Sequence, residues 1–352
     1  MTSVLPSPSS MNEVARFIGH PWIFGRLDGM LISPYVVLYR DGHVGGLDDP
    51  RFRSWKARDT GIALLDEAGA CAMTLLMGEP GPESETVLFE RTDRADTIHC
   101  LIETKPLLAP PERAEACTLS PLPSRRPNLV VLRAGSGSSH PSWLTDIDES
   151  DRNWDLCISW YDSAESFAAC EPAEYNILQN KNRKYQSLHQ LLYPGSPLWD
   201  YEYIAFPDDD IEMSRRDINR MFEIAKCHNL ALSQPALHPS SFYSHQITVQ
   251  QADKRLRYTN FVEVMFPIFS RSALDRCVGS FLLSESSWGL DQLWPKLLGG
   301  HRYQIGIIDA VPVRHVRPVG GSYDMAGAFA DKHRLIQTFA APEDYREFGF
   351  VV

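Results

Sequence analysis

Residues 199–211 read WDYEYIAFPDDDI, an apolar, strand-like run that ends in three consecutive carboxylates, Asp208, Asp209 and Asp210. In open α/β sheets, ligands bind at the carboxyl ends of the strands. Three neighbouring carboxylates repel one another unless a cation neutralises them, and Mg²⁺ prefers oxygen ligands from carboxylates and phosphates. The stretch therefore predicts a cation-binding sheet edge, although a solvated acidic turn before a helix would have the same sequence.

The sequence around this stretch alternates apolar runs with amphipathic segments. Strands are expected at 127–135, 154–162, 230–237 and 302–316, and helices at 182–193, 214–228, 272–283 and 288–298. Ser214 and Asp217 have the spacing of a helix capping box. This alternation predicts an α/β domain over residues 128–352, with a mostly parallel, Rossmann-like sheet and helices on both faces.

The N-terminal part of the chain has a different pattern. Residues 1–105 contain short β-prone runs separated by turn signals such as Asp28-Gly29 and Asp41-Gly42, which are typical of hairpins. We expect a small β-rich module there, sandwich-like or barrel-like. Residues 106–127 contain six prolines and little periodicity, so they are the predicted linker between the two domains.

Composition limits the class of protein. The chain has 352 residues, 43% of them hydrophobic, and a formal net charge of −11. The acidic balance argues against nucleic acid as a partner, because phosphate backbones are bound through an excess of Lys and Arg. No apolar run reaches the length of a membrane span, and residues 1–10 lack the pattern of a secretory signal, so a cytoplasmic location is expected. The oligomeric state is not predicted.

Further motifs follow the acidic stretch in a fixed order. They are SQPAL at 233–237, HQIT at 245–248, VEVMFPIFS at 262–270, WGLD at 288–291 and VRHV at 313–316. Together with the WDY-based strand and its acids, this set resembles the family called domain of unknown function 707, which is grouped with GT-A-like glycosyltransferases. The match covers roughly residues 128–320. Asp209 stands where the family has Glu, and Phe261 where it has Trp.

The resemblance implies a GT-A-like, metal-dependent glycosyltransferase that moves a sugar from a nucleotide-sugar donor to a hydroxyl or amine of a small-molecule or glycan acceptor. The implied cofactor is Mn²⁺ or Mg²⁺, and the expected donor is a UDP-sugar. On this basis Asp210 binds the metal, Asp208 reaches the metal or the ribose, and His315 is the third ligand. A hydrogen-bonded strand histidine is the other interpretation of His315.

The same resemblance assigns the catalytic base to Asp291, at the start of a helix, and implies an inverting reaction. Transfer to a hydroxyl needs a base within hydrogen-bond reach of that hydroxyl. Glu263 is the alternative base, because an acid in the apolar run 262–266 is costly to bury without a functional partner.

Four further residues are candidates for binding the nucleotide sugar. Arg133 ends the first strand of the domain and Asp162 the second, where a base and ribose would lie. Lys184 belongs to a basic cluster that could face the diphosphate, and Asp209 is the middle acid of the triplet. Each could equally be an ordinary structural or solvated residue.

Two other classes of function remain open from the residues alone. A metal-dependent nucleotidyltransferase also uses clustered acids at strand ends. It needs a Gly-rich, Lys/Arg-containing phosphate-binding loop after the first strand, and only the short segment Gly135–Gly137 is present there. A non-catalytic carbohydrate-binding protein is the alternative outside the enzymes.

Overall fold

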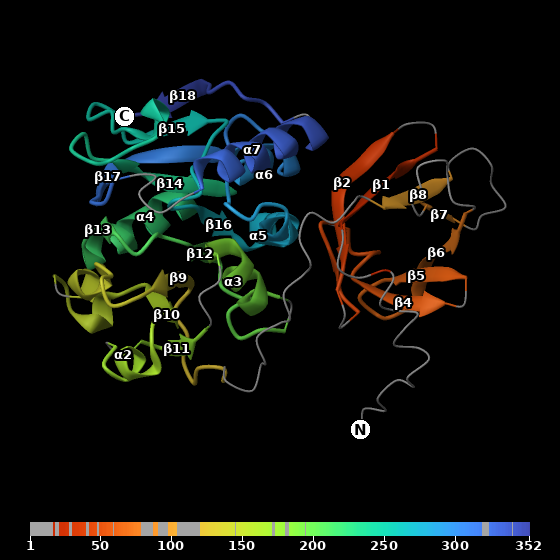
Figure 1. Cartoon of the computed structure of the whole chain (residues 1–352), viewed down its shortest axis with the longest axis horizontal. Helices are drawn as coiled ribbons and strands as arrows, with labels where there is room; N and C mark the ends of the chain where they lie inside the picture. The colour runs from red at the N-terminus through yellow and green to blue at the C-terminus, as the bar shows by residue number, and fades with distance from the viewer. Residues whose placement is uncertain are drawn as a thin grey trace. The chain divides into compact units, whose positions relative to one another are not determined.

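The structure is a computed structural model. It describes residues 17, 21–27, 30–39, 42–47, 49–58, 60–78, 87–90, 98–103, 120–144, 146–170, 173–179, 183–193, 195–318, 324–339 and 341–352. The chain forms two compact units, one of residues 1–111 with 275–283 and the other of residues 112–274 with 284–352 (Figure 1). Most of the predicted linker, 106–119, lies outside the described residues.

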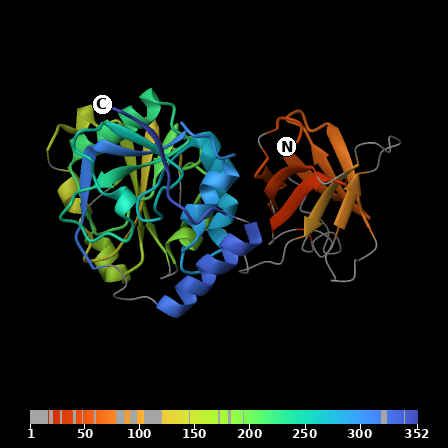
Figure 2. The same ribbon diagram turned by 90° about the horizontal axis from the view of Figure 1, so that it is seen from above.

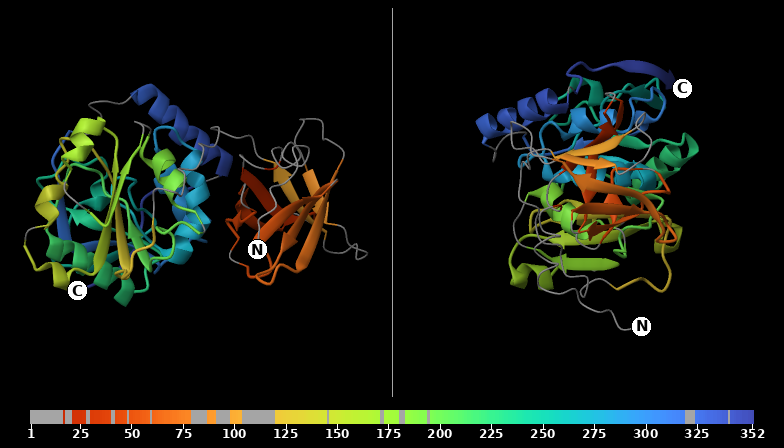
Figure 3. Two further views of the ribbon diagram at one scale, coloured as in Figure 1. Left: turned by 90° about the horizontal axis from the view of Figure 1, so that it is seen from below. Right: turned by 90° about the vertical axis from the view of Figure 1, so that its right-hand side faces the viewer.

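The first unit is an eight-stranded antiparallel sheet. Its strands are β1 (Pro21–Arg26), β2 (Leu31–Leu38), β3 (Val44–Gly45), β4 (Ser54–Arg58), β5 (Gly61–Leu65), β6 (Cys71–Met77), β7 (Val87–Glu90) and β8 (His99–Glu103). They lie in the order β3-β2-β1-β8-β7-β6-β5-β4. A bridge between His43 and Ser54 joins the two edges, so the sheet curls into a nearly closed, barrel-like form (Figure 3).

Aromatic side chains fill the interior of this sheet. Trp22, Phe24 and Trp55 are buried together, and the indole of Trp55 donates a hydrogen bond to the carbonyl of Tyr39 at 2.8 Å. Gly69 turns the chain between β5 and β6 with a φ of 78°, a conformation that glycine adopts without steric cost. Both residues of the predicted Asp28-Gly29 turn lie outside the described residues.

The second unit contains a mixed sheet. Its strands are β9 (Asn128–Ala134), β10 (Trp154–Trp160), β11 (Tyr175–Leu178), β12 (Tyr203–Ala205), β13 (Ile211–Glu212), β14 (Leu232–Leu237), β15 (Leu256–Thr259), β16 (Ile268–Ser270), β17 (Ile305–His315) and β18 (Glu347–Val351). The order is β11-β10-β9-β12-β16-β14-β17-β15-β18, with β13 beside β17.

The prediction of a mostly parallel, Rossmann-like and GT-A-like sheet is wrong. In the described part of the chain the parallel pairs are β10·β11, β9·β10, β9·β12 and β14·β17. All other strand pairs, including every pair of the first unit, are antiparallel. The error arises because β15 and β16 follow β14 without a helical crossover, and an apolar run does not reveal the direction of its strand.

The helices in the described ranges are few and mostly short. They are α2 (Ala164–Ala168), α3 (Lys184–Leu191), α4 (Arg215–Cys227), α5 (Arg271–Cys277), α6 (Leu290–Leu297) and α7 (Met325–Phe339). The capping box predicted at Ser214 and Asp217 is confirmed at the start of α4. Helix α7 packs against α6 (Figure 2). Among the described residues, no helix has both the length and the apolar character needed to cross a membrane.

A buried ion pair fixes β15 on β17. The guanidinium of Arg257 donates to both carboxylate oxygens of Asp309, at 2.8 and 3.0 Å, and both side chains are almost inaccessible to solvent. This two-point geometry is the strong form of an Arg–carboxylate pair. It holds the end of β15 in place, and the chain then continues into the loop that carries Glu263.

Candidate active site

The acidic triplet forms the loop between β12 and β13, and three different segments hold its backbone. The amide of Asp208 donates to the carbonyl of Met265 at 3.0 Å. The carbonyl of Asp209 accepts from Ser139 at 2.7 Å, and that of Asp210 accepts from Val316 at 3.1 Å. Because each residue is tied to another part of the unit, the three carboxylates point toward different partners.

Each of the three carboxylates has a basic side chain beside it. Asp208 pairs with Lys184 at 2.6 Å, and Asp209 with Arg317 at 3.1 Å. Asp210 contacts Nε2 of His315 at 3.2 Å. The mutual repulsion expected from the sequence is therefore reduced by side chains of the protein itself.

His315 lies at the end of β17, opposite Ile211 of β13. Its Nδ1 contacts the carbonyl of Phe242 at 2.7 Å, so this nitrogen carries a proton, and Nε2 faces Asp210. Burial lowers the pKa of His315, but the hydrogen bonds to Asp210 and Phe242 outweigh it and raise the pKa to about 9. His315 is therefore an imidazolium at neutral pH in the ligand-free protein.

The atoms that Asp210 and His315 leave free decide whether they could hold a metal. Oδ1 of Asp210 is buried and has no hydrogen-bond partner in the part of the chain that the structure describes, so it is available to a cation. Within the described residues, however, no group of three or more His, Cys, Asp or Glu side chains is arranged to hold a metal ion. These residues fit a metal held by two protein ligands and completed by phosphate or water oxygens, the arrangement that Mg²⁺ commonly adopts.

Lys184 is the first residue of α3 and points at the acidic loop. Besides Asp208, its ammonium donates to the carbonyls of Val264 and Met265 at 3.1 and 2.9 Å. Tyr185 donates to the same Val264 carbonyl at 2.6 Å. Lys184 therefore links the acidic loop to the loop that carries Glu263.

Glu263 is a buried acid. Its backbone amide donates to the side-chain oxygen of Gln234 at 2.6 Å, while its Oε2 has no partner within the described ranges. Burial, followed by the charges of Asp291 and Asp208, raises the pKa of Glu263 to about 8. At pH 7 this carboxyl is mostly protonated and can donate a hydrogen bond.

Asp291 lies in the first turn of α6, which Gly289 caps. Gly289 has a φ of 91°, and a Cβ there would stand 3.0 Å from the backbone of Lys332 in α7. Burial raises the pKa of Asp291 to about 6, against the opposing charge of Lys332. At pH 7 Asp291 is mostly ionised while its neighbour Glu263 is mostly protonated, a division of roles typical of acid–base sites.

The buried acid Glu263 should make stability depend on pH. Its pKa rises from the ordinary 4.5 to about 8 on folding, so the folded state holds the proton more tightly than the unfolded state. Stability of the wild type should fall as pH rises between these values, because unfolding then releases a proton. We expect the melting temperature of Glu263→Gln relative to wild type to increase from pH 4.5 to about 8 and then level off. The same substitution at the exposed Glu223 is the control, and an equal pH trend in both variants would contradict this account.

Arg133 and Asp162 each take part in hydrogen bonds with residues outside the acidic loop. Arg133 is buried and donates to the hydroxyl of Ser159 at 2.9 Å, and burial lowers its pKa to about 10. Asp162 accepts hydrogen bonds from the amide and hydroxyl of Ser136, at 3.0 and 2.7 Å. The first contact joins β9 to β10, and the second joins the loops that follow these two strands. The nucleotide-sugar roles predicted for both residues stay predictions.

Two residues of the site were not selected from the sequence. The hydroxyl of Tyr161 donates to Asp209 at 2.8 Å, and Gln234 positions the backbone of Glu263. Tyr161 directly follows a buried strand, so its position at a strand end was a usable signal. Gln234 lies within the SQPAL motif, but nothing in the motif indicates what its side chain binds.

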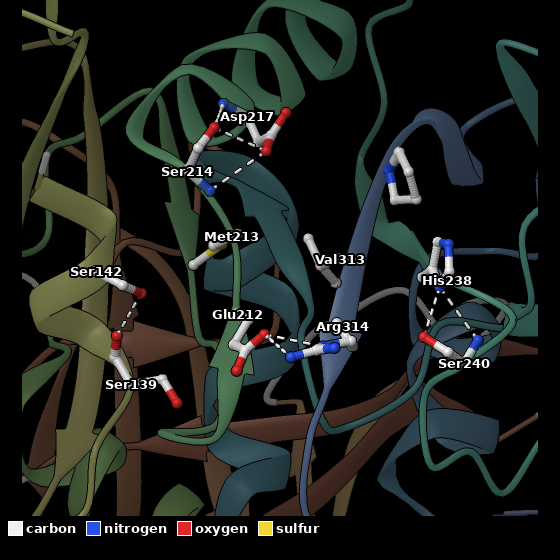
Figure 4. Close-up of a pocket in the computed structure, with 11 residues that line it drawn as sticks. Ser139, Ser142, Glu212, Met213, Ser214, Asp217, His238, Ser240, Val313 and Arg314 are labelled. Carbon is white, nitrogen blue, oxygen red and sulfur yellow. Dashed lines mark hydrogen bonds and ion pairs between the residues drawn. The ribbon is translucent and has the colours of Figure 1, made fainter. Parts of the chain in front are cut away.

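A surface pocket of about 700 Å³ adjoins this region without containing it. Arg314 and Glu212, two of the residues that line it, form an ion pair (Figure 4). Its other lining residues are Ser139, Ser142, Met213, Ser214, Asp217, His238, Ser240, Pro312 and Val313. Arg314 is thus held by Glu212, while the next residue, His315, faces Asp210.

Comparison with known proteins places the chain in a family. The profile of the family described as "Protein of unknown function (DUF707)" matches residues 151–334, which is more than half of the chain, so the protein belongs to this family. No curated protein matches. Among solved structures, the chain is similar to the crystal structure of S. aureus TarS 1-349, with 10% sequence identity and a TM-score of 0.38, over 60% of this chain and 70% of that one.

Proposed function

We propose that this protein is a glycosyltransferase that uses a nucleotide-sugar donor and an inverting mechanism. The observation that carries the proposal is the pair Asp291 and Glu263, two buried carboxyls whose pKa values burial raises to about 6 and about 8. Glu263 is influenced by the charges of Asp291, Asp208, His315 and Lys184, and Asp291 by that of Lys332. An ionised acid can accept the proton of an acceptor hydroxyl. A protonated acid and cationic side chains beside it can stabilise an anionic leaving group.

In the proposed reaction Asp291 is the base. It takes the proton of the acceptor hydroxyl, and the acceptor oxygen forms a bond with the anomeric carbon of the sugar. The bond between that carbon and the diphosphate oxygen breaks, and its electron pair leaves on the nucleoside diphosphate. Lys184 carries positive charge toward the departing diphosphate, and protonated His315 does so when no metal is bound. The single displacement inverts the anomeric centre.

A divalent cation fits this proposal through Asp210 and His315. When bound, it would neutralise the two phosphates of the donor, a role that electrophilic metals commonly have. His315 would first have to lose its Nε2 proton, because a protonated nitrogen cannot be a ligand. In this proposal Asp208 orients the ammonium of Lys184 toward the phosphates of the donor.

The function is tested by donor hydrolysis. The purified protein is incubated with UDP-, GDP-, ADP- and dTDP-sugars in Mn²⁺, and the released nucleoside diphosphate is measured by ion-exchange chromatography. We expect slow release from one nucleotide class, with a change of the anomeric configuration in the NMR spectrum of the sugar. Release of pyrophosphate from a nucleoside triphosphate, with none from any nucleotide sugar, would instead identify a nucleotidyltransferase.

A further inference from the structure

Three aromatic rings pack together beside the catalytic carboxyls. His245, Phe261 and Tyr345 have ring centroids 4.8, 4.7 and 5.3 Å apart, all in edge-to-face geometry. The hydroxyl of Tyr345 lies 2.9 Å from Nδ1 of His245. Phe261 is fully buried behind the other two, whereas 40% of the surface of Tyr345 is exposed. Tyr345 and His245 therefore present an aromatic surface on a rigid support.

The backbone on either side of Tyr345 is fixed by one residue, Asn260. Its side-chain oxygen accepts from the amide of Arg346 at 2.7 Å, and its side-chain nitrogen donates to the carbonyl of Asp344 at 2.8 Å. Its backbone amide also donates to the carbonyl of Arg346 at 3.2 Å. These three hydrogen bonds hold Tyr345 against Phe261, the residue next to Asn260.

The aromatic surface is next to the proposed base. A hydrogen bond joins Tyr345 to the side chain of Gln292, and the backbone amide of Gln292 donates to the carboxylate of Asp291 at 3.1 Å. Burial, followed by the negative charge of Asp291, raises the pKa of Tyr345 to about 12. Oε1 of Gln292 and Oε2 of Glu263 are both buried without a partner among the described residues. Unpaired buried polar oxygens at this position call for hydrogen-bond partners from a ligand.

His245 is electrically neutral at this surface. Burial, followed by the positive charge of Lys332, lowers the pKa of His245 to about 4. When Nδ1 accepts from the hydroxyl of Tyr345, the remaining proton lies on Nε2, which can then donate to a hydroxyl of a ligand. A neutral aromatic surface with one such donor suits a neutral polyhydroxylated ring better than an anion.

We infer that Tyr345, His245 and Phe261 form the acceptor subsite, and that it takes the face of a pyranose ring whose hydroxyl reaches Asp291. The C–H face of a pyranose matches the electron-rich face of an aromatic ring, while its hydroxyls match the polar rim. This inference rests on the proposed function, because it identifies the substrate class of that site. Tyr345 lies beyond residues 151–334, so the family match does not include it.

The test uses saturation-transfer NMR with the full-length protein and the methyl pyranosides of glucose, galactose, mannose and N-acetylglucosamine, with and without nucleoside diphosphate and Mn²⁺. We expect transfer to the ring C–H protons of at least one of these pyranosides. Tyr345→Ala should weaken that binding by roughly ten-fold, since an aromatic contact contributes of this order. Tyr345→Phe should keep the stacking and weaken binding less. The exposed Tyr303 provides the matched control, Tyr303→Ala.

The outcomes separate the subsite from the function. Binding that is weakened roughly ten-fold in a Tyr345→Ala protein that still melts as one folded species, weakened less in Tyr345→Phe and retained in Tyr303→Ala supports the subsite. Equal losses in the two alanine variants, or no pyranoside bound by the wild type, would overturn it. Normal donor hydrolysis without pyranoside binding refutes the subsite alone. Pyranoside binding at Tyr345 without any donor hydrolysis refutes the proposed function alone.

Discussion

Asp291→Asn is expected to abolish sugar transfer while leaving the protein folded and able to bind its donor. Asparagine keeps the size of the side chain and its place in the first turn of α6, but it cannot accept the proton of the acceptor hydroxyl. Loss of a general base typically lowers the rate by about 10²–10⁴-fold. The measurement is the transfer rate beside the melting temperature and the dissociation constant of the nucleoside diphosphate.

The control for this variant is another first-turn acid. Glu165 occupies the first turn of α2 and is exposed, so Glu165→Gln should leave the transfer rate unchanged. Glu263→Gln gives the decisive comparison, because an amide can still donate the hydrogen bond of a protonated carboxyl. Transfer within a few-fold of wild type in Asp291→Asn, together with a folded but inactive Glu263→Gln, would move the base to Glu263.

Local structure could be predicted from the sequence where the interactions that form it join residues close together in the chain. The capping box of Ser214 and Asp217 is an example, because its hydrogen bonds close within three residues and require no knowledge of the rest of the fold. The meeting of Asp210 with His315 is not local, since 104 other residues separate them along the chain. Only the ordered set of motifs indicated that these two would lie together.

The direction of the strands could not be predicted from the sequence, and neither could the long-range hydrogen bonds that position the site residues. Strands β9 and β10 are buried along their whole length, so their residues read the same in a parallel or an antiparallel sheet. The hydrogen bond of Arg133 to Ser159 is another example, because it depends on the neighbouring strand β10 and no local pattern around Arg133 indicates it. The position of Tyr345 could not be predicted from the sequence. It depends on the hydrogen bonds of Asn260 to the residues on either side of Tyr345, and Asn260 is far away in the chain.

Asp210→Asn is expected to remove the cooperation between a divalent cation and a nucleoside diphosphate. In the wild type, Mn²⁺ and the diphosphate together should raise the melting temperature more than the sum of their separate effects, because each supplies ligands or charge to the other. The asparagine side chain would retain one oxygen but lose the negative charge that holds the cation. The substitution also leaves His315 without its carboxylate partner at 3.2 Å.

Thermal-shift titration checks this expectation in wild type and in two variants. Asp210→Asn should lose the cooperative part of the shift, while Asp253→Asn, an exposed acid in the turn before β15, should retain it. By mass action, a ligand present at about 100 times its dissociation constant raises the free energy of unfolding by about 2.7 kcal/mol. The corresponding change in melting temperature is large enough for the loss of cooperation to be measured. Because His315 must release a proton before it can bind a cation, the cooperative shift should also grow as pH rises toward about 9, the pKa of His315. Equal stabilisation by the diphosphate in EDTA and in Mn²⁺ would show that Lys184 and His315 hold the phosphates as cations, without a metal.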